Sequence, residues 1–486
     1  MAITGVAAAG YTAAPLKQTL ATNYIDFTAN GNGWAQQYLP DLMEQEAEVF
    51  GNRTISGFLS QVGAEEAMSS DQVIWSEQGR LHLSYKAVAM TASTTTGTLK
   101  FDSGSQDVDG KSVTSTTTAV LHGIRPGDML LISDSDATAQ CYVTAVAGLN
   151  STAANSGAVT FERYNGAAIV SSSLGAGDVS VLVYGSEYAK GVEGRAGANK
   201  PQHLSRTNKP IILKDKYEVS GSDASQIGWV EVSGEDGQNG YMWYLKAAGD
   251  TKARFADYLE MAMMESIDGG VTSAGHQGGA ITGTEGLWDA LSTRGNVASV
   301  MTTLTDYDEM IAELDANGSI EENMMFMDRT TSLQLDDILS ALAGPGANAS
   351  YGVFDNSENM ALNLGFSGFR RGSYDFYKSD FKYLNDASTR GLINSTDAAN
   401  AIHGVLIPAG VSSVYDQNLG KNLKRPFLHV RYRASNLESR KFKTWTTGSV
   451  GAATSDLDAM EMHMLSERCL VVQGANNFVL FKGATA

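Results

Sequence analysis

Hydrophobic and polar residues alternate over residues 72–90, which indicates extended structure. Val73 and Trp75 share one face, and Tyr85 continues the alternation after Gly79. A period of two residues is typical of half-buried strands, and a glycine between two such runs is a turn signal. The pattern therefore predicts a β-hairpin over residues 72–90.

The pattern changes over residues 91–190, which are rich in Ser, Thr and Gly and contain no Trp. Short hydrophobic runs recur there between turn signals, one of which is Arg125-Pro126-Gly127-Asp128. The runs are 119–121, 129–132, 142–146, 158–161 and 179–184. Several short strands at this spacing predict an inserted all-β domain, either a small barrel or a sandwich.

A glycine-rich connector over residues 191–204 leads into a second extended segment at 211–232. A helical pattern follows over residues 241–267, where Phe255 and Leu259 belong to one hydrophobic stripe. A helix of about 27 residues would span roughly 40 Å. The sequence thus predicts a return strand followed by one long helix.

Shorter helices and strands alternate in the second half of the chain. Residues 305–308 resemble a capping box, which predicts a helix start. Residues 324–327 predict a strand, and 328–342 predict a second helix. The later predicted strands are 366–378, 405–407 and 427–432, followed by a closing hairpin over 468–482. Helices and strands in this order indicate an α+β fold.

Composition narrows the classes of function. The chain has 486 residues, a net charge of −19 and only 18% charged residues, against about 25% in typical globular chains. A strongly acidic chain is not expected to coat DNA. No run of about 18 apolar residues occurs, so no membrane span or membrane partner is expected. The N-terminal residues do not resemble a signal peptide. Cys141 and Cys469 are expected to be reduced and buried.

The sequence contains no motif that predicts catalysis, and we expect no enzyme activity, cofactor or metal. The seven histidines are scattered, without the close spacing of a metal site. Nucleophile elbows, phosphate-binding loops and complete dinucleotide fingerprints do not occur. Residues 107–110 and 134–136 have calcium-like spacing, but neither continues into a loop ending in glutamate, so turns are the favoured interpretation.

Residues 421–443 are rich in positive charge: they contain eight basic residues and one acidic residue. Three interpretations remain open: a contact with an acidic neighbouring subunit, a contact with DNA, or a solvated strand edge protected by Lys and Arg. The candidate intersubunit contacts, here and in the segment 72–90, are Trp75, Arg80, Tyr85, Lys421, Lys424, Arg425, Arg431, Arg433, Arg440, Lys441 and Lys443.

The order of these elements resembles the major capsid proteins of tailed phages with the HK97 fold. The return strand with its Val219-Ser220-Gly221 turn, the long helix, the α/β region and the closing Cys469…Phe481 segment carry the resemblance, which covers most of the chain. Trp75…Glu77, Pro126-Gly127-Asp128 and Gly194 also resemble capsid proteins of crAss-like and related podophages.

The resemblance implies an HK97-like division of the chain, with a spine helix, peripheral and axial domains, and an extended loop (the E-loop) that contains the insertion. The implied parts are an N-terminal arm (1–70), the E-loop and return strands (71–90 and 191–232), the inserted β domain (91–190), the spine helix and peripheral domain (233–284), the axial domain (285–410) and the return to the peripheral domain (411–486).

The family also implies a function by assembly. Copies of the chain would form pentamers and hexamers that tile an icosahedral phage head around double-stranded DNA. The protein would be assembled in the cytoplasm of a host bacterium and end in the virion. The implied partners are a scaffolding protein, a portal protein and a decoration protein. The scaffolding protein is expected to be a separate chain, because residues 1–70 lack a long charged helix that could act as a fused scaffold.

A second interpretation of the whole chain is a secreted or surface-layer structural protein that binds glycans through residues 91–190. An enzyme with a β accessory domain is a third, and it lacks a catalytic constellation. Within the capsid interpretation, the insertion could bind glycans, hold a decoration protein or brace adjacent subunits.

Overall fold

A computed structural model gives the structure of the chain. It describes residues 58–59, 64–77, 82–92, 95–101, 104–107, 113, 122–135, 137–147, 158–166, 178–195, 204–224, 231–233, 239–271, 281–342, 368–397, 399–409, 411–416, 421–450 and 453–483. These fall into two compact units, one of Met1–Trp75 with Thr207–Ala486 and the other of Ser76–Arg206. The predicted N-terminal arm, 1–70, therefore lies mostly outside the described residues.

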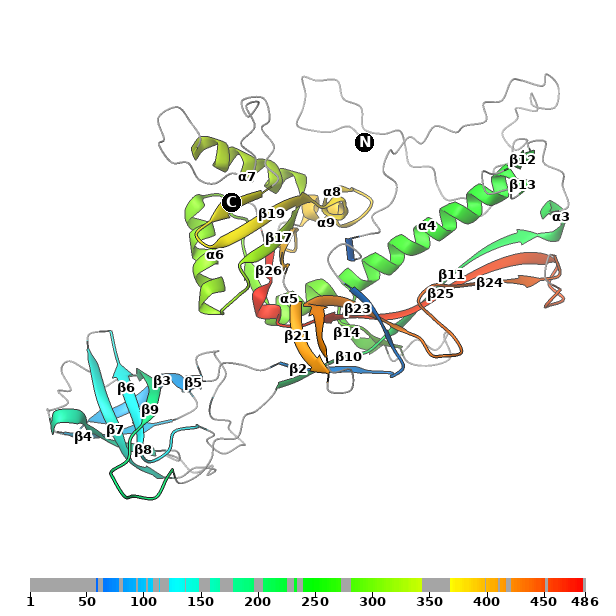
Figure 1. Ribbon diagram of the computed structural model, residues 1–486. Helices are drawn as coiled ribbons and strands as arrows, with labels where there is room; N and C mark the ends of the chain where they lie inside the picture. The colour runs from blue at the N-terminus through cyan, green and yellow to red at the C-terminus, as the bar shows by residue number, and fades with distance from the viewer. Residues whose placement is uncertain are drawn as a thin grey trace. The chain divides into compact units, whose positions relative to one another are not determined.

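The unit Ser76–Arg206 is a closed β structure (Figure 1). Its strands are β3 (Ser84–Ala92), β4 (Thr96–Lys100), β5 (Gln106–Asp107), β6 (Asp128–Ser133), β7 (Thr138–Ala147), β8 (Ala158–Arg163) and β9 (Asp178–Ser186). They pair in the order β4-β8-β7-β6-β9-β3-β5, and β4 also pairs with β3, which closes the sheet into a barrel. A short 3₁₀ turn, η1 (Tyr164–Gly166), follows β8.

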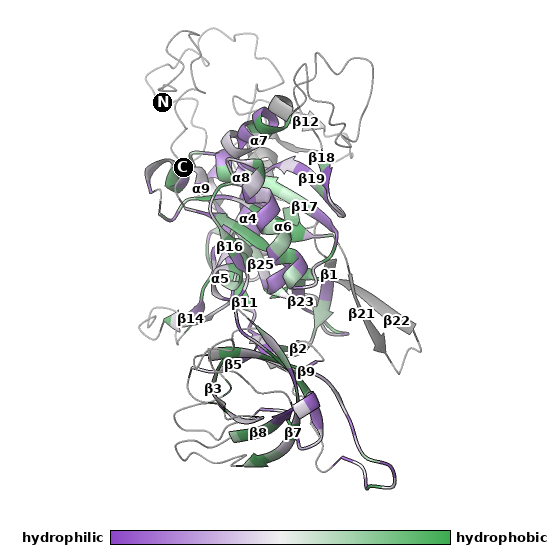
Figure 2. Ribbon diagram, turned by 90° about the vertical axis from the view of Figure 1, so that its left-hand side faces the viewer, coloured by the Kyte–Doolittle hydropathy of each residue, from purple (hydrophilic) through white to green (hydrophobic). Residues whose placement is uncertain are grey.

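Alternation explains why these segments form a barrel with a dry interior. In β6 every second residue is buried, with Leu130 and Ile132 at 0% exposure. Hydrophobic residues colour much of β8 in Figure 2. The strands predicted at 129–132, 142–146, 158–161 and 179–184 are confirmed; the run 119–121 lies outside the described residues. The unit begins before residue 91, because β3 supplies part of the barrel.

The predicted hairpin over residues 72–90 is wrong. β2 (Val73–Glu77) pairs instead with β10 (Leu204–Asn208), and β3 belongs to the barrel. Alternation marks a strand but does not name its partner, because any strand with a matching face can complete the ladder. The outgoing strand meets the returning strand more than a hundred residues later, so the boundary between the units runs through this pair.

The turn Arg125-Pro126-Gly127-Asp128 secures the segment that follows β9. Gly127 has φ +92° and donates its N–H to the Val143 carbonyl at 2.9 Å. Its own carbonyl accepts from the Glu187 N–H at 3.0 Å. The Asp128 carboxylate accepts from the Arg125 N–H at 2.8 Å and from Arg195 at 2.9 Å. This turn therefore ties residues 187–195 to the barrel.

Gly127→Ala should destabilise the barrel unit by about 2 kcal/mol, because the left-handed backbone disfavours a side chain. An added Cβ would also lie 2.9 Å from the Tyr188 ring. The barrel unit contains no Trp, so thermal unfolding is followed by the near-ultraviolet circular dichroism of its tyrosines. Gly194→Ala is the matched control, because a Cβ added there would have no other atom within 4 Å. Equal losses in the two variants would contradict the expectation.

A five-stranded sheet organises one part of the other unit. Its strands are β1 (Ala64–Met68), β11 (Ile211–Ser220), β23 (Leu428–Arg433), β24 (Lys443–Gly448) and β25 (Ala459–Val472). The long strand β25 is central: its first half lies between β11 and β24, and its second half pairs with β23. β1 is parallel to β23 at the edge. The strand predicted at 427–432 is confirmed in β23. The extended segment predicted at 211–232 is confirmed only as far as Ser220 in β11, because Gly221–Ala224 form a short helix, α3.

The predicted long helix is confirmed as α4 (Met242–Glu265), 24 residues long, or about 36 Å at 1.5 Å per residue. It lies along β11 and β25 (Figure 1). Phe255 and Leu259 of the helix pack against Met464 of β25, with Leu213 of β11 beside them. The helix ends before two further short strands, β14 (Asp268–Val271) and β15 (Ile281–Gly283), which pair with each other.

A six-stranded sheet with helices forms the rest of this unit. Its strands, in the order β16-β26-β20-β17-β19-β18, are Asn296–Ala298, Val479–Lys482, Ile402–Pro408, Glu322–Met327, Tyr374–Asp380 and Gly368–Arg371. The helices are α5 (Leu287–Arg294), α6 (Leu304–Ala316), α7 (Arg329–Leu342), α8 (Lys382–Asn385) and α9 (Arg390–Thr396). The predicted strands 324–327 and 405–407 and the helix 328–342 are confirmed. Figure 2 shows hydrophilic and hydrophobic residues interleaved along α7.

Small elements complete the described chain. They are α3 (Gly221–Ala224), the pair β12 (Glu231–Ser233) and β13 (Asn239–Tyr241), the pair β21 (Val411–Asp416) and β22 (Lys421–Pro426), and the 3₁₀ turn η3 (Ala475–Asn477). The predicted helix start is shifted by two residues: Thr303 is the N-cap of α6, and Asp306 completes the capping box. The predicted strand 366–378 is two antiparallel strands, β18 and β19, separated by Gly372 at φ +62°.

The predicted closing hairpin over residues 468–482 is wrong. β25 ends at Val472 in the five-stranded sheet, while β26 enters the six-stranded sheet beside β20. Gly474, which lies between the two strands, adopts a left-handed conformation where the chain passes from one sheet to the other. Both hydrophobic runs are buried, and each pairs with strands of a different sheet. The crossing unites the two sheets around one core, to which Leu470 and Leu480 both belong.

A buried ion pair lies under α7. His403 of β20 contacts the Asp328 carboxylate through Nδ1 at 2.9 Å and the Gly483 carbonyl through Nε2 at 3.0 Å. The hydrogen bond to Asp328 raises the pKa of His403 against the opposing effect of burial. Burial acts to raise the pKa of Asp328, but hydrogen bonds from His403 and Thr331 outweigh it and lower that pKa.

We expect this unit to lose stability both at acidic pH, through Asp328, and at alkaline pH, through His403. The His403 contribution is present below its ordinary pKa of 6.5 and is lost as pH rises through the raised folded value. The Asp328 contribution is present above its ordinary pKa of 3.8 and is lost as pH falls through the lowered folded value. Melting temperatures measured from about pH 2 to 9 test this. His403→Gln should flatten the alkaline side, and an unchanged alkaline slope in that variant would contradict the assignment.

Candidate functional site

The basic segment predicted to meet a neighbouring subunit is paired with acidic groups of its own chain where its side chains are described. Arg431 of β23 meets Glu66 of β1 at 2.8 Å. Arg433 and Arg440 both bind Glu467 of β25, at 2.7 and 2.6 Å. These charges therefore bind strands of the five-stranded sheet to one another.

Glu467 is the centre of this arrangement. Its side chain is 5% exposed, while Arg433 and Arg440 are 25% and 30% exposed. The two arginines lie at the two ends of residues 433–440, whose backbone is closed by the Arg440 N–H and the Arg433 carbonyl at 2.8 Å. One buried carboxylate thus holds the base of a surface loop from both sides.

A second acidic side chain, Glu65 of β1, adds to the same cluster. It pairs with Lys441 and lies 3.9 Å from the Arg468 guanidinium. Arg433 also reaches Asp71. Burial lowers the pKa of Arg468, and the nearby charge of Glu65 opposes that effect. Arg431 and Lys441 are consequently neutralised in part by acidic residues of β1, which lies more than 360 positions earlier in the chain.

The remaining basic candidates are differently placed. Lys443 on β24 donates to Glu438 at 2.6 Å and lies 5.5 Å from the Trp445 ring centre. Lys421, Lys424 and Arg425 belong to β22, which pairs with β21 as a separate hairpin; their side chains, like all of Arg80, lie outside what the structure describes.

Trp75 is buried inside the chain. Its side chain is 7% exposed and belongs to a cluster with Met68, Val73, Cys469 and Val471. The Arg294 guanidinium lies 5.6 Å from the ring centre, a distance at which a cation is attracted to the π face. A side chain so covered offers little surface to a neighbouring subunit.

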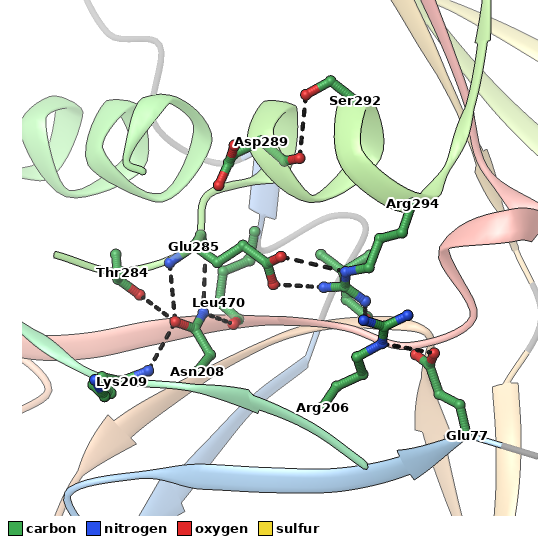
Figure 3. Close-up of polar contacts among 11 residues, drawn as sticks. Glu77, Arg206, Asn208, Lys209, Thr284, Glu285, Asp289, Ser292, Arg294 and Leu470 are labelled. Carbon is green, nitrogen blue, oxygen red and sulfur yellow. Dashed lines mark hydrogen bonds and ion pairs between the residues drawn. The ribbon is translucent and has the colours of Figure 1, made fainter. Parts of the chain in front are cut away.

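Arg294 belongs to a polar junction where β10, β25 and the segment before α5 meet (Figure 3). It forms a two-pronged contact with the Glu285 carboxylate, including 2.5 Å from Nη2 to Oε2, and donates to the Val472 carbonyl at 3.2 Å. In the same view, Arg206 contacts Glu77 at 3.8 Å, which links β10 to β2. Planar two-pronged pairing with a carboxylate fixes orientation as well as charge.

Asn208 is the centre of that junction, and sequence reasoning missed it. Its amide group donates to the carbonyls of Glu285 at 3.0 Å and Leu470 at 2.6 Å. Its carbonyl accepts from the N–H groups of Lys209 at 2.8 Å and Glu285 at 2.9 Å, and from the Thr284 hydroxyl at 3.0 Å. At 2% exposure, it satisfies backbone groups from three chain segments (Figure 3). A lone Asn at the end of a strand gave no signal of this role.

Tyr85 lies in the barrel core, 4% exposed. Its hydroxyl accepts from the Gly123 N–H at 2.7 Å, and its ring meets Phe101 edge to face at 5.2 Å. Burial raises the pKa of Tyr85. The hydrogen bond to Gly123 attaches residues 122–125 to the barrel. Because the ring is buried, it offers little surface to a neighbouring subunit.

The two cysteines are reduced and buried, and burial raises the pKa of each to about 12. Among the described residues, no group of three or more His, Cys, Asp or Glu side chains is placed to hold a metal ion. Within the same residues, every helix is too short or too polar to cross a membrane.

No protein-family model and no curated protein matches the chain. Several solved structures are similar to it. The capsid of a native GTA particle matches with a TM-score of 0.38 and 10% identity, over 94% of this chain and 100% of the other. A structure from Microbacterium phage Oxtober96 matches with a TM-score of 0.36 and 10% identity, over 93% and 98%. The capsid structure of Cyanophage P-SCSP1u matches with a TM-score of 0.33 and 11% identity, over 62% and 80%.

Proposed function

We propose that the chain is a major capsid protein with an HK97-like fold, which assembles with copies of itself into an icosahedral phage head around DNA. The observation that carries this is the ribbon formed by α4 with β11, β24 and β25. The cluster that packs the middle of α4 on β25 has three buried members, Phe255, Leu259 and Met464. In β11, one residue of ten, Val219, is buried. A helix and strands of this length with so little internal core are suited to burial against other copies.

In this proposal each part of the chain has a place in the shell. The pair β2–β10 is the base of the E-loop, which carries the barrel as its insertion. α4 is the spine helix, the five-stranded sheet with it forms the peripheral domain, and the six-stranded sheet with α5 to α9 forms the axial domain. The role is structural rather than enzymatic, and pentamers and hexamers are the assembly units.

The internal pairing of Arg431, Arg433 and Arg440 bears on which contacts hold the shell. These charges stabilise the subunit itself, so we propose the other basic candidates, Arg80, Lys421, Lys424 and Arg425, as contacts with a neighbour or with DNA. We propose Lys421, Lys424 and Arg425 first, because β21 and β22 pair only with each other among the described strands. A hairpin with two open edges is suited to adding to a neighbouring sheet.

Negative-stain electron microscopy and sedimentation velocity test the function directly. The chain is expressed alone and together with the products of neighbouring genes, including a scaffolding protein. Closed shells or rings of five and six are the expected result with scaffold, and efficient shells without it would contradict the need for a scaffold. A monodisperse monomer under both conditions would overturn the capsid function.

The second candidate, a secreted or surface-layer glycan-binding protein, rests on the barrel as a separate compact unit. Glycan-array binding by a protein that stays monomeric would favour it. Within the capsid proposal, the barrel would brace adjacent subunits, bind a decoration protein or bind glycans. Stable, normal shells from a chain that lacks residues 91–190 would contradict bracing.

A further inference from the structure

The barrel carries tyrosines on the outer surface of three neighbouring strands, β7, β6 and β9. Leu130 and Ile132 of β6 are buried in the barrel core, so Met129, which alternates with them, points outward. The strand register pairs Met129 with Tyr142 of β7. Residues directly opposite each other in adjacent strands share a face, so Tyr142 also lies on the outside of the barrel.

A β-bulge adds Tyr184 of β9 to the same surface. Met129 pairs with Gly185, but the next residue, Leu130, pairs with Val183, so Tyr184 is the extra residue between them. Bulges of this kind redirect a side chain, and Tyr184 is 47% exposed. A Cβ added at Gly185 would lie 2.7 Å from the methyl carbon of Met129. The Met129 side chain therefore lies over this glycine, on the outer surface.

Glu187 holds two tyrosines at this end of the barrel. The hydroxyl of Tyr164, in η1, donates to Glu187 Oε2 at 2.7 Å, and the hydroxyl of Tyr142 donates to the Glu187 carbonyl at 3.2 Å. Their rings meet edge to face, with centres 6.3 Å apart. Partial burial and the hydrogen bond to Glu187 raise the pKa of Tyr164, and the nearby Tyr184 adds to this effect. We call Tyr142, Tyr164, Tyr184 and Glu187 the tyrosine patch.

The tyrosine patch combines aromatic faces with hydrogen-bonding oxygens, which suits a sugar ring. The C–H groups on one face of a pyranose can pack on an aromatic ring, while its hydroxyls can donate to carboxylate and phenol oxygens. The Glu187 carboxylate and the net charge of −19 disfavour anionic ligands such as phosphates and uronic acids. The chemistry of the patch therefore favours a neutral carbohydrate.

The area of the patch is small for a protein partner. An aromatic side chain offers roughly 200 Å² of surface. Tyr184 is the most exposed of the three tyrosines, so together they offer at most about 300 Å². A stable protein interface buries about 800 Å² on each partner. The patch therefore suits a small ligand better than a second protein.

We propose that the tyrosine patch binds the neutral hexose units of a carbohydrate. Tyr142 and Tyr184 pack on the sugar, and Glu187 accepts hydrogen bonds from its hydroxyls. The inference rests on the proposed function, in which carbohydrate binding is one of the roles open to the barrel, and it goes further by naming the residues and the class of ligand.

An array of immobilised oligosaccharides, probed with assembled particles, tests the proposal. The probes are neutral hexose oligosaccharides and their uronic-acid counterparts. We expect binding to the neutral probes, and Tyr184→Ala should weaken it roughly tenfold. Tyr377→Ala is the matched control and should bind like the unaltered chain, because Tyr377 is 44% exposed on β19, in the other unit.

The outcomes separate this proposal from the capsid function. Particles that assemble but bind no neutral probe, or that lose binding equally in the two variants, would overturn the carbohydrate site and leave the capsid function standing. A chain that binds the neutral probes without assembling would count against the capsid function alone. Disulfide-linked dimers of Tyr184→Cys in oxidised particles would show a contact between copies at the patch and overturn the carbohydrate site.

Glu187→Gln tests the choice of a neutral ligand without removing an aromatic ring. The Gln side chain can still accept from the Tyr164 hydroxyl, so the patch should keep its shape. Without the negative charge, binding of the uronic-acid probes should rise roughly tenfold relative to the neutral probes. An unchanged preference between the two classes of probe would overturn the role assigned to Glu187.

Discussion

Replacing Asn208 by Ala should lower the free energy of unfolding of its unit by about 3–5 kcal/mol, since each buried backbone group that loses its hydrogen bond costs about 1–3 kcal/mol. The substitution leaves the Leu470 carbonyl and the Glu285 N–H and carbonyl without the partner that the structure provides. The side chain is 2% exposed, so water cannot readily take its place. Denaturant unfolding followed by tryptophan fluorescence is the measurement, since Trp288 lies in the same unit.

Two further variants sharpen this test. Asn208→Asp keeps the shape but replaces two donors by a carboxylate that would face two carbonyl oxygens, so it should be at least as damaging as Asn208→Ala. Asn296→Ala is the control, because Asn296 donates to the Asn476 carbonyl at 2.7 Å on the surface and its loss should cost less than about 1 kcal/mol. Equal effects at positions 208 and 296 would show that the junction does not carry the stability we assign to it.

Glu467→Gln should be the second most damaging change, at about 2–3 kcal/mol: removing one member of a buried pair can cost about 3–5 kcal/mol, and the partial exposure of the two arginines reduces that figure. The substitution keeps the volume of the side chain but removes the charge that Arg433 and Arg440 share. The melting temperature at low and high salt is the measurement. Since the carboxylate is buried, the loss should persist at high salt.

Glu438→Gln is the matched control for Glu467→Gln. Glu438 pairs with Lys443, and their side chains are 47% and 42% exposed. Exposed pairs of this kind contribute little to stability and weaken in salt. A Glu467→Gln variant as stable as Glu438→Gln would contradict the central role of the buried carboxylate, and residues 433–440 would then be held by their backbone contacts alone.

Local pattern was sufficient to predict the strands of the barrel and the long helix. In β6, alternation from Leu130 to Ile132 is a signal contained in the strand itself. α4 was predictable for the same reason, because the stripe through Phe255 and Leu259 repeats at helical spacing. α5 was missed although Leu287, Trp288 and Leu291 share one buried face; a helix of eight residues offers only about two turns of pattern.

Strand partners and polar contacts were not predictable, because they join positions far apart in the sequence. β2 pairs with β10 and β26 with β20, so both predicted hairpins failed at the choice of partner rather than at the recognition of a strand. The basic residues of β23 were recognised by composition, but their acidic partners Glu66 and Glu467 lie on two other strands. The role of Asn208 depends on three segments that only the fold brings together.

The parallel pairing of β1 with β23 has a consequence for biosynthesis. Ala64 lies opposite His429, so 365 residues separate the two partners. At about 5–20 residues per second, the ribosome needs roughly 20–70 s to make the second strand after the first. All strands of the barrel are synthesised during that interval, so the barrel can fold on the nascent chain. β1 stays without its partner strand until β23 has been made. Nascent subunits on one messenger are therefore exposed to mispairing, and a holding chaperone that covers β1 until β23 emerges would raise the yield of assembly-competent protein.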